Sequence, residues 1–84
     1  MNAYVFIDSL PEQTDHITSM LRKKDGVMLA DVINGPHNII AVLESMDAAG
    51  LAKTVVFEIR KMKGVQNVTV YLAINEEERK PSKA

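Results

Sequence analysis

Apolar residues gather in four short runs, and a longer stretch with helical spacing precedes the second run and the fourth. The runs cover 3–7, 27–33, 39–44 and 67–74. They are rich in β-branched and aromatic residues and are bounded by Gly, Pro, Asn, Asp or Ser, which is typical of β-strands. We therefore predict four strands, of which the second and third follow each other directly.

Two helices are predicted, one from about Glu12 to Lys24 and one from Ala48 to Met62. Pro11 suits a first helical turn, while Gly26 and Gly64 follow the last turns, where glycine commonly ends a helix. Apolar positions recur at helical spacing in both segments. They are Ile17, Met20 and Leu21 in the first, and Leu51, Ala52, Val55, Ile59 and Met62 in the second.

The segment 34–38, which joins the second and third strands, reads Asn-Gly-Pro-His-Asn. An Asn-Gly loop between two strand-like runs predicts a β-hairpin. Gly35 is expected to take a positive φ and reverse the chain, because Pro36 also keeps it out of the α region. His37 would then stand at the loop tip. It is either a solvated imidazole on an ordinary turn or a group presented to a ligand or a neighbouring subunit.

The predicted order is a strand–helix–strand unit followed by a second unit of the same kind. A weak repeat supports this order, because Leu21–Val27 resembles Ile59–Val65 and each joins a helix end through glycine to a strand. Two such units predict a ferredoxin-like βαββαβ fold of the α+β class, with an antiparallel four-stranded sheet and two helices on one face. The domain is predicted for residues 1–75, and a charged C-terminal tail for 76–84.

The predicted strands lack the apolar–polar alternation expected of a sheet with one solvated face. In the first strand Tyr4 and Phe6 oppose three further apolar residues, and in the third strand Ile40 and Val42 do the same. The face of the sheet without helices is therefore also largely apolar. Such a patch usually marks an interaction site, and a second subunit is its simplest cover.

Composition narrows the classes of function. A chain of 84 residues forms one small domain, and 46% hydrophobic residues is rich for that size, which favours association. The net charge of −1 gives no electrostatic footprint for nucleic acid. The absence of Cys excludes disulfides and thiolate metal sites, and with only His16 and His37 as imidazoles we expect no metal or cofactor. No signal-peptide pattern or membrane-length apolar segment is seen, so a cytoplasmic protein is expected.

Three segments together resemble the effector-binding (RAM) domain of the Lrp/AsnC transcription regulators. They are Ala3–Ile7, Asn34–Val42 and Ile59–Val65, in the order and spacing of that domain, and the resemblance extends over roughly 3–74. The DNA-binding helix-turn-helix of the family does not precede them, so the resemblance indicates a stand-alone version. It also implies dimerisation through the sheet, rings of dimers, and small effectors, usually amino acids, bound between dimers.

The resemblance places the ligand-binding residues at Gly35, His37 and Asn38 of the loop and at Val68 and Val70 of the last strand. Where the family typically reads Gly-x-Tyr-Asp, His37 replaces the aromatic residue and Asn38 replaces the acid. Val68 and Val70 stand where the family often has Thr or Ser. Because a neutral amide gives an ammonium group no charge assistance, we expect an amino acid to bind weakly.

The leading prediction is a non-enzymatic ligand-sensing and oligomerisation domain that modulates transcription regulation or metabolism. One alternative is an assembly-only subunit that co-oligomerises with full-length Lrp/AsnC regulators. Another is a small dimeric ferredoxin-like enzyme that uses a histidine in a sheet pocket. The position of His37 on a turn, rather than on a strand, weighs against the enzyme.

Overall fold

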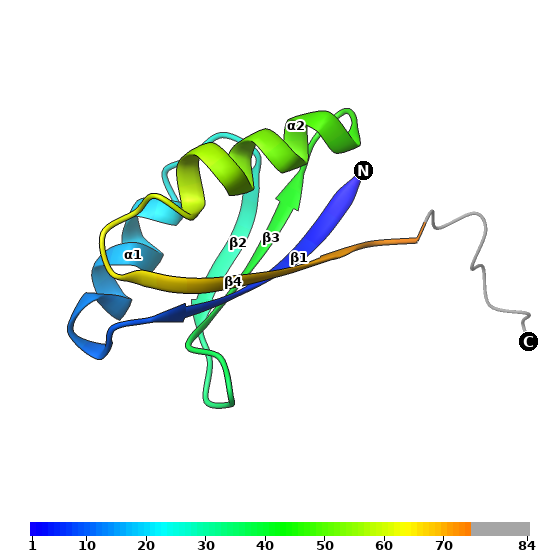
Figure 1. The fold of residues 1–84 in the computed structure, drawn as a ribbon. Helices are drawn as coiled ribbons and strands as arrows, with labels where there is room; N and C mark the ends of the chain where they lie inside the picture. The colour runs from blue at the N-terminus through cyan, green and yellow to red at the C-terminus, as the bar shows by residue number, and fades with distance from the viewer. Residues whose placement is uncertain (75–84) are drawn as a thin grey trace, which may run out of the picture.

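Four antiparallel strands form one sheet, and the helical segments cover one of its faces (Figure 1). The computed structural model describes residues 1–74. The strands are β1 (Asn2–Ser9), β2 (Val27–Val32), β3 (Ile39–Glu44) and β4 (Val65–Leu72), arranged in the order β2-β3-β1-β4. This topology confirms the predicted ferredoxin-like α+β fold. The charged tail predicted at 76–84 lies outside the described residues.

The first helix is shorter than predicted. A 3₁₀ turn, η1 (Pro11–Gln13), leads into α1 (Thr14–Leu21), so the regular helix ends at Leu21 and not at Lys24. Lys23 and Lys24 donate their backbone N–H groups to carbonyls only three residues back, at 3.1 and 3.0 Å. Bonds of this kind tighten the chain into turns and satisfy the last carbonyls of a helix.

The second helix starts as predicted but changes type along its length. α2 (Ala48–Lys53) continues as a π-helix, η2 (Thr54–Ile59), whose wider turn is seen where Arg60 N–H bonds the Val55 carbonyl, five residues back, at 2.9 Å. The apolar stripe of this helix repeats every four residues, and this period is longer than the 3.6 residues per turn of an α-helix. The wider turns therefore keep that stripe directed at the sheet, and its members are all buried: Leu51, Val55 and Ile59.

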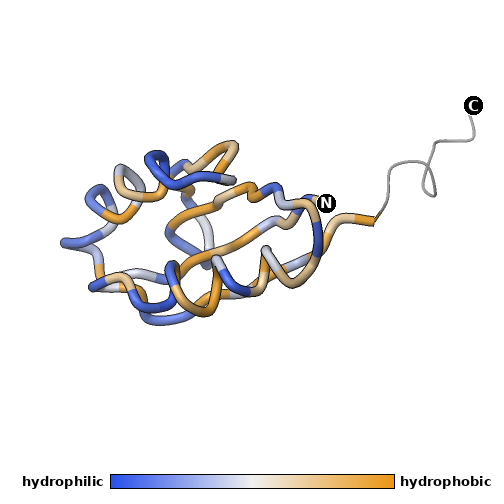
Figure 2. Tube along the Cα trace, turned by 90° about the horizontal axis from the view of Figure 1, so that it is seen from above, coloured by the Kyte–Doolittle hydropathy of each residue, from blue (hydrophilic) through white to orange (hydrophobic). Residues whose placement is uncertain are grey.

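The core lies between the helices and the sheet. Apolar positions run along the strands, whereas the turns at the helix ends are more hydrophilic (Figure 2). The buried residues come from every layer: Ala3, Val5 and Ile7 of β1, Ala30 of β2, Ile39, Ala41 and Leu43 of β3, Ile17 and Leu21 of α1, and the stripe on α2 and η2. Among residues 1–74, no helix has both the length and the apolar character needed to span a membrane.

Two glycines with positive φ return the chain from the helices to the sheet. They are Gly26, with φ 85°, and Gly64, with φ 95°. The carbonyl of Gly26 accepts the N–H of Glu44 at 2.7 Å, and the carbonyl of Gly64 accepts the N–H of Leu10 at 2.9 Å. The positive φ expected at Gly35 was wrong, because the longer loop reverses the chain over several residues without a left-handed position.

The loop between β2 and β3 is fastened to β1 by its last residue. Ile33 N–H bonds the Asn38 carbonyl at 2.9 Å, which closes the predicted hairpin, and Asn38 N–H bonds the Ile7 carbonyl at 3.0 Å. The side chain of Asn38 also takes part, because its Oδ1 accepts the N–H of Ser9 at 2.8 Å. Asn38 therefore holds the loop to the end of the central strand.

Gly64→Ala is expected to lower the free energy of unfolding by about 2 kcal/mol, because a left-handed residue with a Cβ costs about 1–2 kcal/mol. The added methyl would also lie 2.5 Å from Cβ of Gln13, which cannot swing away. Gly35→Ala is the control, since nothing lies within 4 Å of its new Cβ. Urea denaturation of both variants tests this, and equal destabilisation would contradict it.

Asn38→Ala is expected to cost about 1–3 kcal/mol of stability, because it leaves the half-buried N–H of Ser9 without an acceptor. Asn38→Asp keeps an acceptor oxygen and is expected to lose less. Asn34→Ala, at an exposed position of the same loop, serves as the control for loop composition. Thermal unfolding followed by circular dichroism ranks the stability of the three variants. If Asn38→Ala leaves the melting temperature unchanged, the hydrogen bond from Ser9 to Asn38 does not stabilise the fold.

Candidate functional site

His37 does not stand free at the loop tip. Its Nδ1 lies 2.8 Å from Oδ1 of Asp8, at the end of β1, and both side chains are only 30% exposed. The imidazole also packs beside Phe6, with the ring centroids 5.2 Å apart. The interpretation of His37 as a solvated imidazole on an ordinary turn was therefore wrong, because the loop folds back against β1.

Asp8 connects the loop with the last strand. Its Oδ2 accepts a long hydrogen bond from Nδ2 of Asn67 at 3.5 Å, and the two residues stand opposite each other in the β1–β4 ladder. The sequence analysis did not select Asp8 or Asn67, since each follows or precedes an apolar run and is typical of a strand end. Only the pairing of β1 with β4, and the return of the loop, bring these two residues together with His37.

The predicted ligand-binding residues fall into two groups. His37 and Asn38 lie against β1, and Gly35 of the same loop is exposed. Val68 and Val70 stand opposite Ile7 and Val5 in the ladder, so they belong to the face that the helices cover. The sheet thus separates the two groups within one chain, and a shared role in ligand binding stays a prediction.

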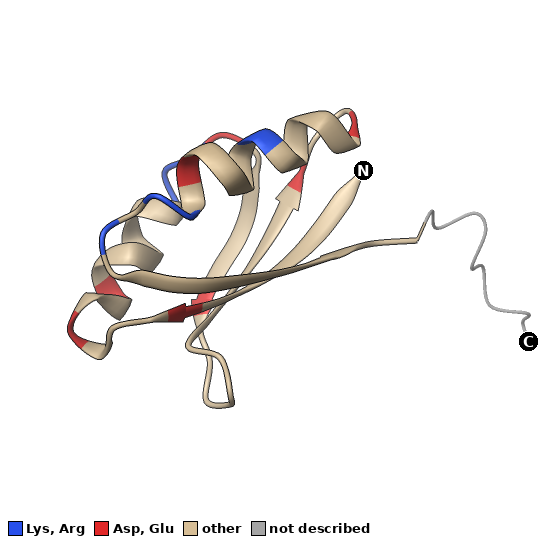
Figure 3. Cartoon of the chain, viewed as in Figure 1, with Lys and Arg blue, Asp and Glu red and all other residues tan. Residues whose placement is uncertain are grey.

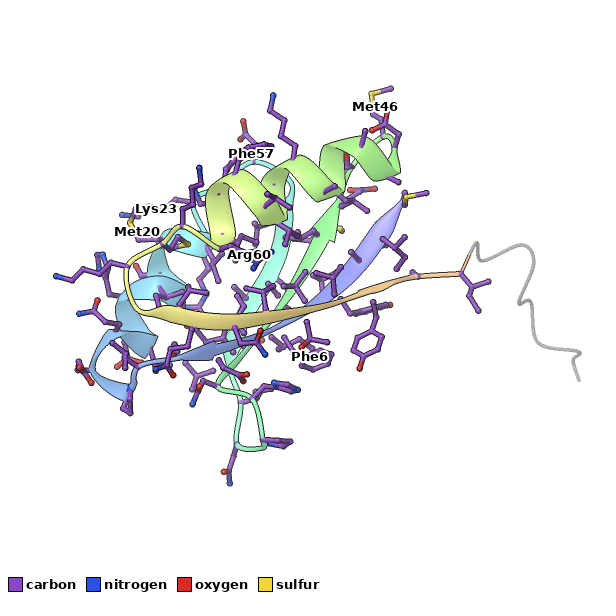
Figure 4. All side chains as sticks on the ribbon, viewed as in Figure 1. Phe6, Met20, Lys23, Met46, Phe57 and Arg60 are labelled. Atoms are coloured by element: carbon purple, nitrogen blue, oxygen red, sulfur yellow. The ribbon has the colours of Figure 1, made fainter. Side chains whose placement is uncertain are left out.

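The face of the sheet without helices is largely apolar, as predicted, and it also carries Asp31, opposite Ile40, and Thr69, opposite Phe6. In the ladders Tyr4 stands opposite Val42 and Tyr71, and Phe6 stands opposite Ile40 and Thr69. Figure 4 shows Phe6 on the side of the sheet away from the helices. We call this the open face and define it by six residues: Tyr4, Phe6, Leu29, Ile40, Val42 and Tyr71. The ring of Tyr71 meets Phe6 edge-on at 6.0 Å, so aromatic groups lead from β4 to His37.

Positive charge in the described part of the chain is confined to the helical layer. Every Lys and Arg among residues 1–74 lies on a helix or in the turn that follows one (Figure 3). The strands carry only acids, namely Asp8, Asp31 and Glu44. Asp31 is paired with Arg22 at 3.0 Å, whereas the ion-pair partner of Asp8 within the described part of the chain is His37. Residues 1–74 hold no group of three or more side chains placed to bind a metal ion.

Comparison with known proteins bears on this fold. No protein-family model and no curated protein matches the sequence. Among solved structures, a hypothetical protein from Pyrococcus horikoshii is 22% identical with a TM-score of 0.83, and the match covers 94% of this chain and 95% of that one. AsnC of Escherichia coli is 13% identical with a TM-score of 0.82, over 88% of this chain and 50% of that one.

A third similar structure is a transcriptional regulator of Neisseria meningitidis, solved as a complex with L-methionine. It is 14% identical with a TM-score of 0.80, and the match covers 89% of this chain and 50% of the regulator. The chain thus spans nearly all of the Pyrococcus protein and about half of each regulator. The likeness inferred from the sequence is confirmed at the level of fold: these residues form a domain like those of AsnC-type proteins.

Proposed function

We propose that this chain is a ligand-sensing and oligomerisation domain related to the effector domain of Lrp/AsnC regulators. It binds a small molecule, an amino acid, and thereby modulates transcription regulation or metabolism. The observation that carries the proposal is the β2–β3 loop, which is tied to β1 through Asn38 and His37 inside a fold shared with AsnC. A loop held in one conformation presents groups to a ligand with little loss of entropy on binding.

The domain forms at least a dimer through the open face. Two tyrosines and a leucine of that face are 38–58% exposed in the single chain: Tyr4, Leu29 and Tyr71. Burial of a sheet-sized apolar surface is the main source of stability in obligate interfaces. Dimers joined in this way leave the β2–β3 loop at the edge of the interface, where it can meet a further dimer.

The effector binds between dimers, at Gly35, His37 and Asn38 of one loop and near Val68 and Val70 of β4. The two groups lie on different faces of one sheet, so a site that uses both draws them from different subunits. The regulator of Neisseria meningitidis was solved with L-methionine, which supports an amino acid as the class of effector.

Two other functions are alternatives to ligand sensing. An assembly-only subunit would join full-length regulators and bind no effector. An enzyme would use His37, which the Asp8 carboxylate orients through Nδ1 as in many general bases. We favour the sensing role because the similar structures with a described function are transcription regulators.

Tyr4→Lys is expected to weaken the dimer at least about tenfold, because it places an unpaired charge in an apolar interface. The matched control is Phe57→Lys, which replaces an aromatic residue that is 62% exposed on the helical layer, away from the open face (Figure 4). Sedimentation velocity over a micromolar concentration series gives both dissociation constants. A monomeric wild type, or an equal increase in the dimer dissociation constant in both variants, would contradict the proposed interface.

Wild-type protein is expected to bind at least one of the twenty amino acids weakly in calorimetric titration. Asn38→Asp should strengthen that binding by about 1 kcal/mol, because one oxygen can keep the Ser9 N–H while the other adds a charged acceptor. Asn34→Asp adds the same charge at the exposed end of the loop and should change little. Native mass spectrometry of the purified protein reports stoichiometry and retained ligand. No binding by any of these proteins would favour the assembly-only role.

A further inference from the structure

We propose that the outer face of α2 and η2 is a docking surface for an acidic amphipathic helix of a partner protein. The outer face is the side of this helical segment that points away from the sheet. We define it by six exposed residues: Met46, Ala49, Ala52, Lys53, Val56 and Phe57. The inference goes beyond ligand sensing, because this face lies on the other side of the molecule from the open face and stays accessible when two open faces pair.

The helical segment is apolar on its outer side as well as on its inner side. Through α2 and η2 the only charged residues are Lys53 and Glu58, and Thr54 is the only other polar one. A surface helix ordinarily carries polar residues opposite its apolar stripe, whereas a helix that is apolar all round is usually buried. Here the outer side is open, since Val56 is 42% exposed and Phe57 62%. The composition therefore indicates a helix that a further layer covers.

The wider turns of η2 align the outer residues. The buried stripe, whose members stand four residues apart, faces the sheet. Ala49, Lys53 and Phe57 stand at the same spacing and form a row on the opposite side. Figure 4 shows Met46, just before α2, and Phe57, on η2, both directed away from the sheet. With a rise of about 1.5 Å per residue, the row offers contact to about three turns of a partner helix.

The side chains of the outer face differ in size in a way that suits a helix. Ala49 and Ala52 present only methyl groups, whereas Phe57 projects at the other end. The distance between packed helices depends on the side chains at their contact, so the alanines permit a close approach and Phe57 fills a groove between the ridges of the partner. Aromatic residues in such positions carry much of the free energy of binding in protein interfaces.

The charges on this side of the segment are positive and are not neutralised within the described chain. Lys53 lies in the outer row, and Nζ of Lys61 lies 5.4 Å from the ring centroid of Phe57. The ion pairs formed within residues 1–74 include neither lysine. Two cations beside an apolar row are complementary to a helix whose apolar stripe is flanked by Asp or Glu.

The acids of the same segment do not offset these lysines. Glu58 lies 3.4 Å from Nζ of Lys24, and Asp47 accepts the N–H of Gly50 at 2.8 Å. A second copy of this face would therefore bring two further lysines and no available carboxylate. Because like charges brought together across an interface oppose binding, the electrostatics favour an acidic partner over self-association.

The test uses two fluorescently labelled helical peptides of about 16 residues, long enough to form a helix on binding. Both carry leucine at helical spacing on one side, and the remaining positions are mostly glutamate in one peptide and lysine in the other. Fluorescence polarisation with the full chain gives both affinities. The wild type is expected to bind the glutamate peptide at least about tenfold more tightly than the lysine peptide, and more tightly at low than at high ionic strength.

Two variants locate the binding. Phe57→Ala and Lys53→Glu are each expected to weaken binding of the glutamate peptide at least about tenfold. The matched controls are Val32→Ala, 52% exposed on β2, and Lys23→Glu, exposed in the turn after α1. Each should change the affinity less than about twofold. Circular dichroism shows whether each variant is folded, and sedimentation velocity shows whether the open-face dimer persists, so that loss of docking is distinguished from loss of the dimer.

Equal binding of the two peptides, or equal affinity of wild type and Phe57→Ala, would overturn the proposal. It would also be overturned by evidence for a different occupant. Assembly beyond the open-face dimer that Phe57→Ala abolishes would assign a second copy to the outer face. Tighter peptide binding after Glu76→Gln, Glu77→Gln and Glu78→Gln together would assign the acidic segment of the chain itself. Cosedimentation with phosphatidylserine vesicles that depends on Phe57 would assign a lipid surface.

Discussion

The pairing of β1 with both β3 and β4 is the constraint on which the rest of the molecule depends. Successive side chains of a strand point to opposite faces, so β1 must serve both sides of the sheet at once. Ala3, Val5 and Ile7 are completely buried under the helices, while Tyr4, Phe6 and Asp8 face the other way. A slip of one residue would move a carboxylate into the core and expose the apolar set. The register that secures the core therefore also places the candidate site.

Local patterns were sufficient for the order of the elements. The bounds of β3 were predicted correctly, and those of β2 to within one residue, because apolar runs and turn residues report strands directly. The change from α- to π-helix after Lys53 was not predicted, because the stripe of apolar residues is compatible with either type of helix. The conformation of Gly35 was mistaken for a similar reason: an Asn-Gly pair indicates a turn but does not fix φ in a longer loop.

Only part of the candidate site could be predicted from the sequence. His37 and Asn38 could be selected from the loop itself, and the resemblance to Lrp/AsnC regulators drew attention to them. Asp8 could not, because its role depends on a contact with a residue far along the chain, and its local context is that of an ordinary strand end. Asn38 also has a structural role that no local pattern revealed, since its side-chain oxygen accepts the backbone N–H of Ser9 in β1. Asn38 therefore has a role in the fold in addition to the ligand-binding role predicted for it.

The two glycine turns give the molecule an internal near-symmetry. Gly26 joins α1 to β2 within the first βαβ unit, and its carbonyl accepts the N–H of Glu44, the last residue of β3 in the second unit. Gly64 joins η2 to β4 within the second unit, and its carbonyl accepts the N–H of Leu10, which directly follows β1 of the first unit. Each half thus accepts a backbone hydrogen bond from the other half at the equivalent point, where a strand leads into a helix. The folding of the two halves is therefore coupled at both strand-to-helix corners.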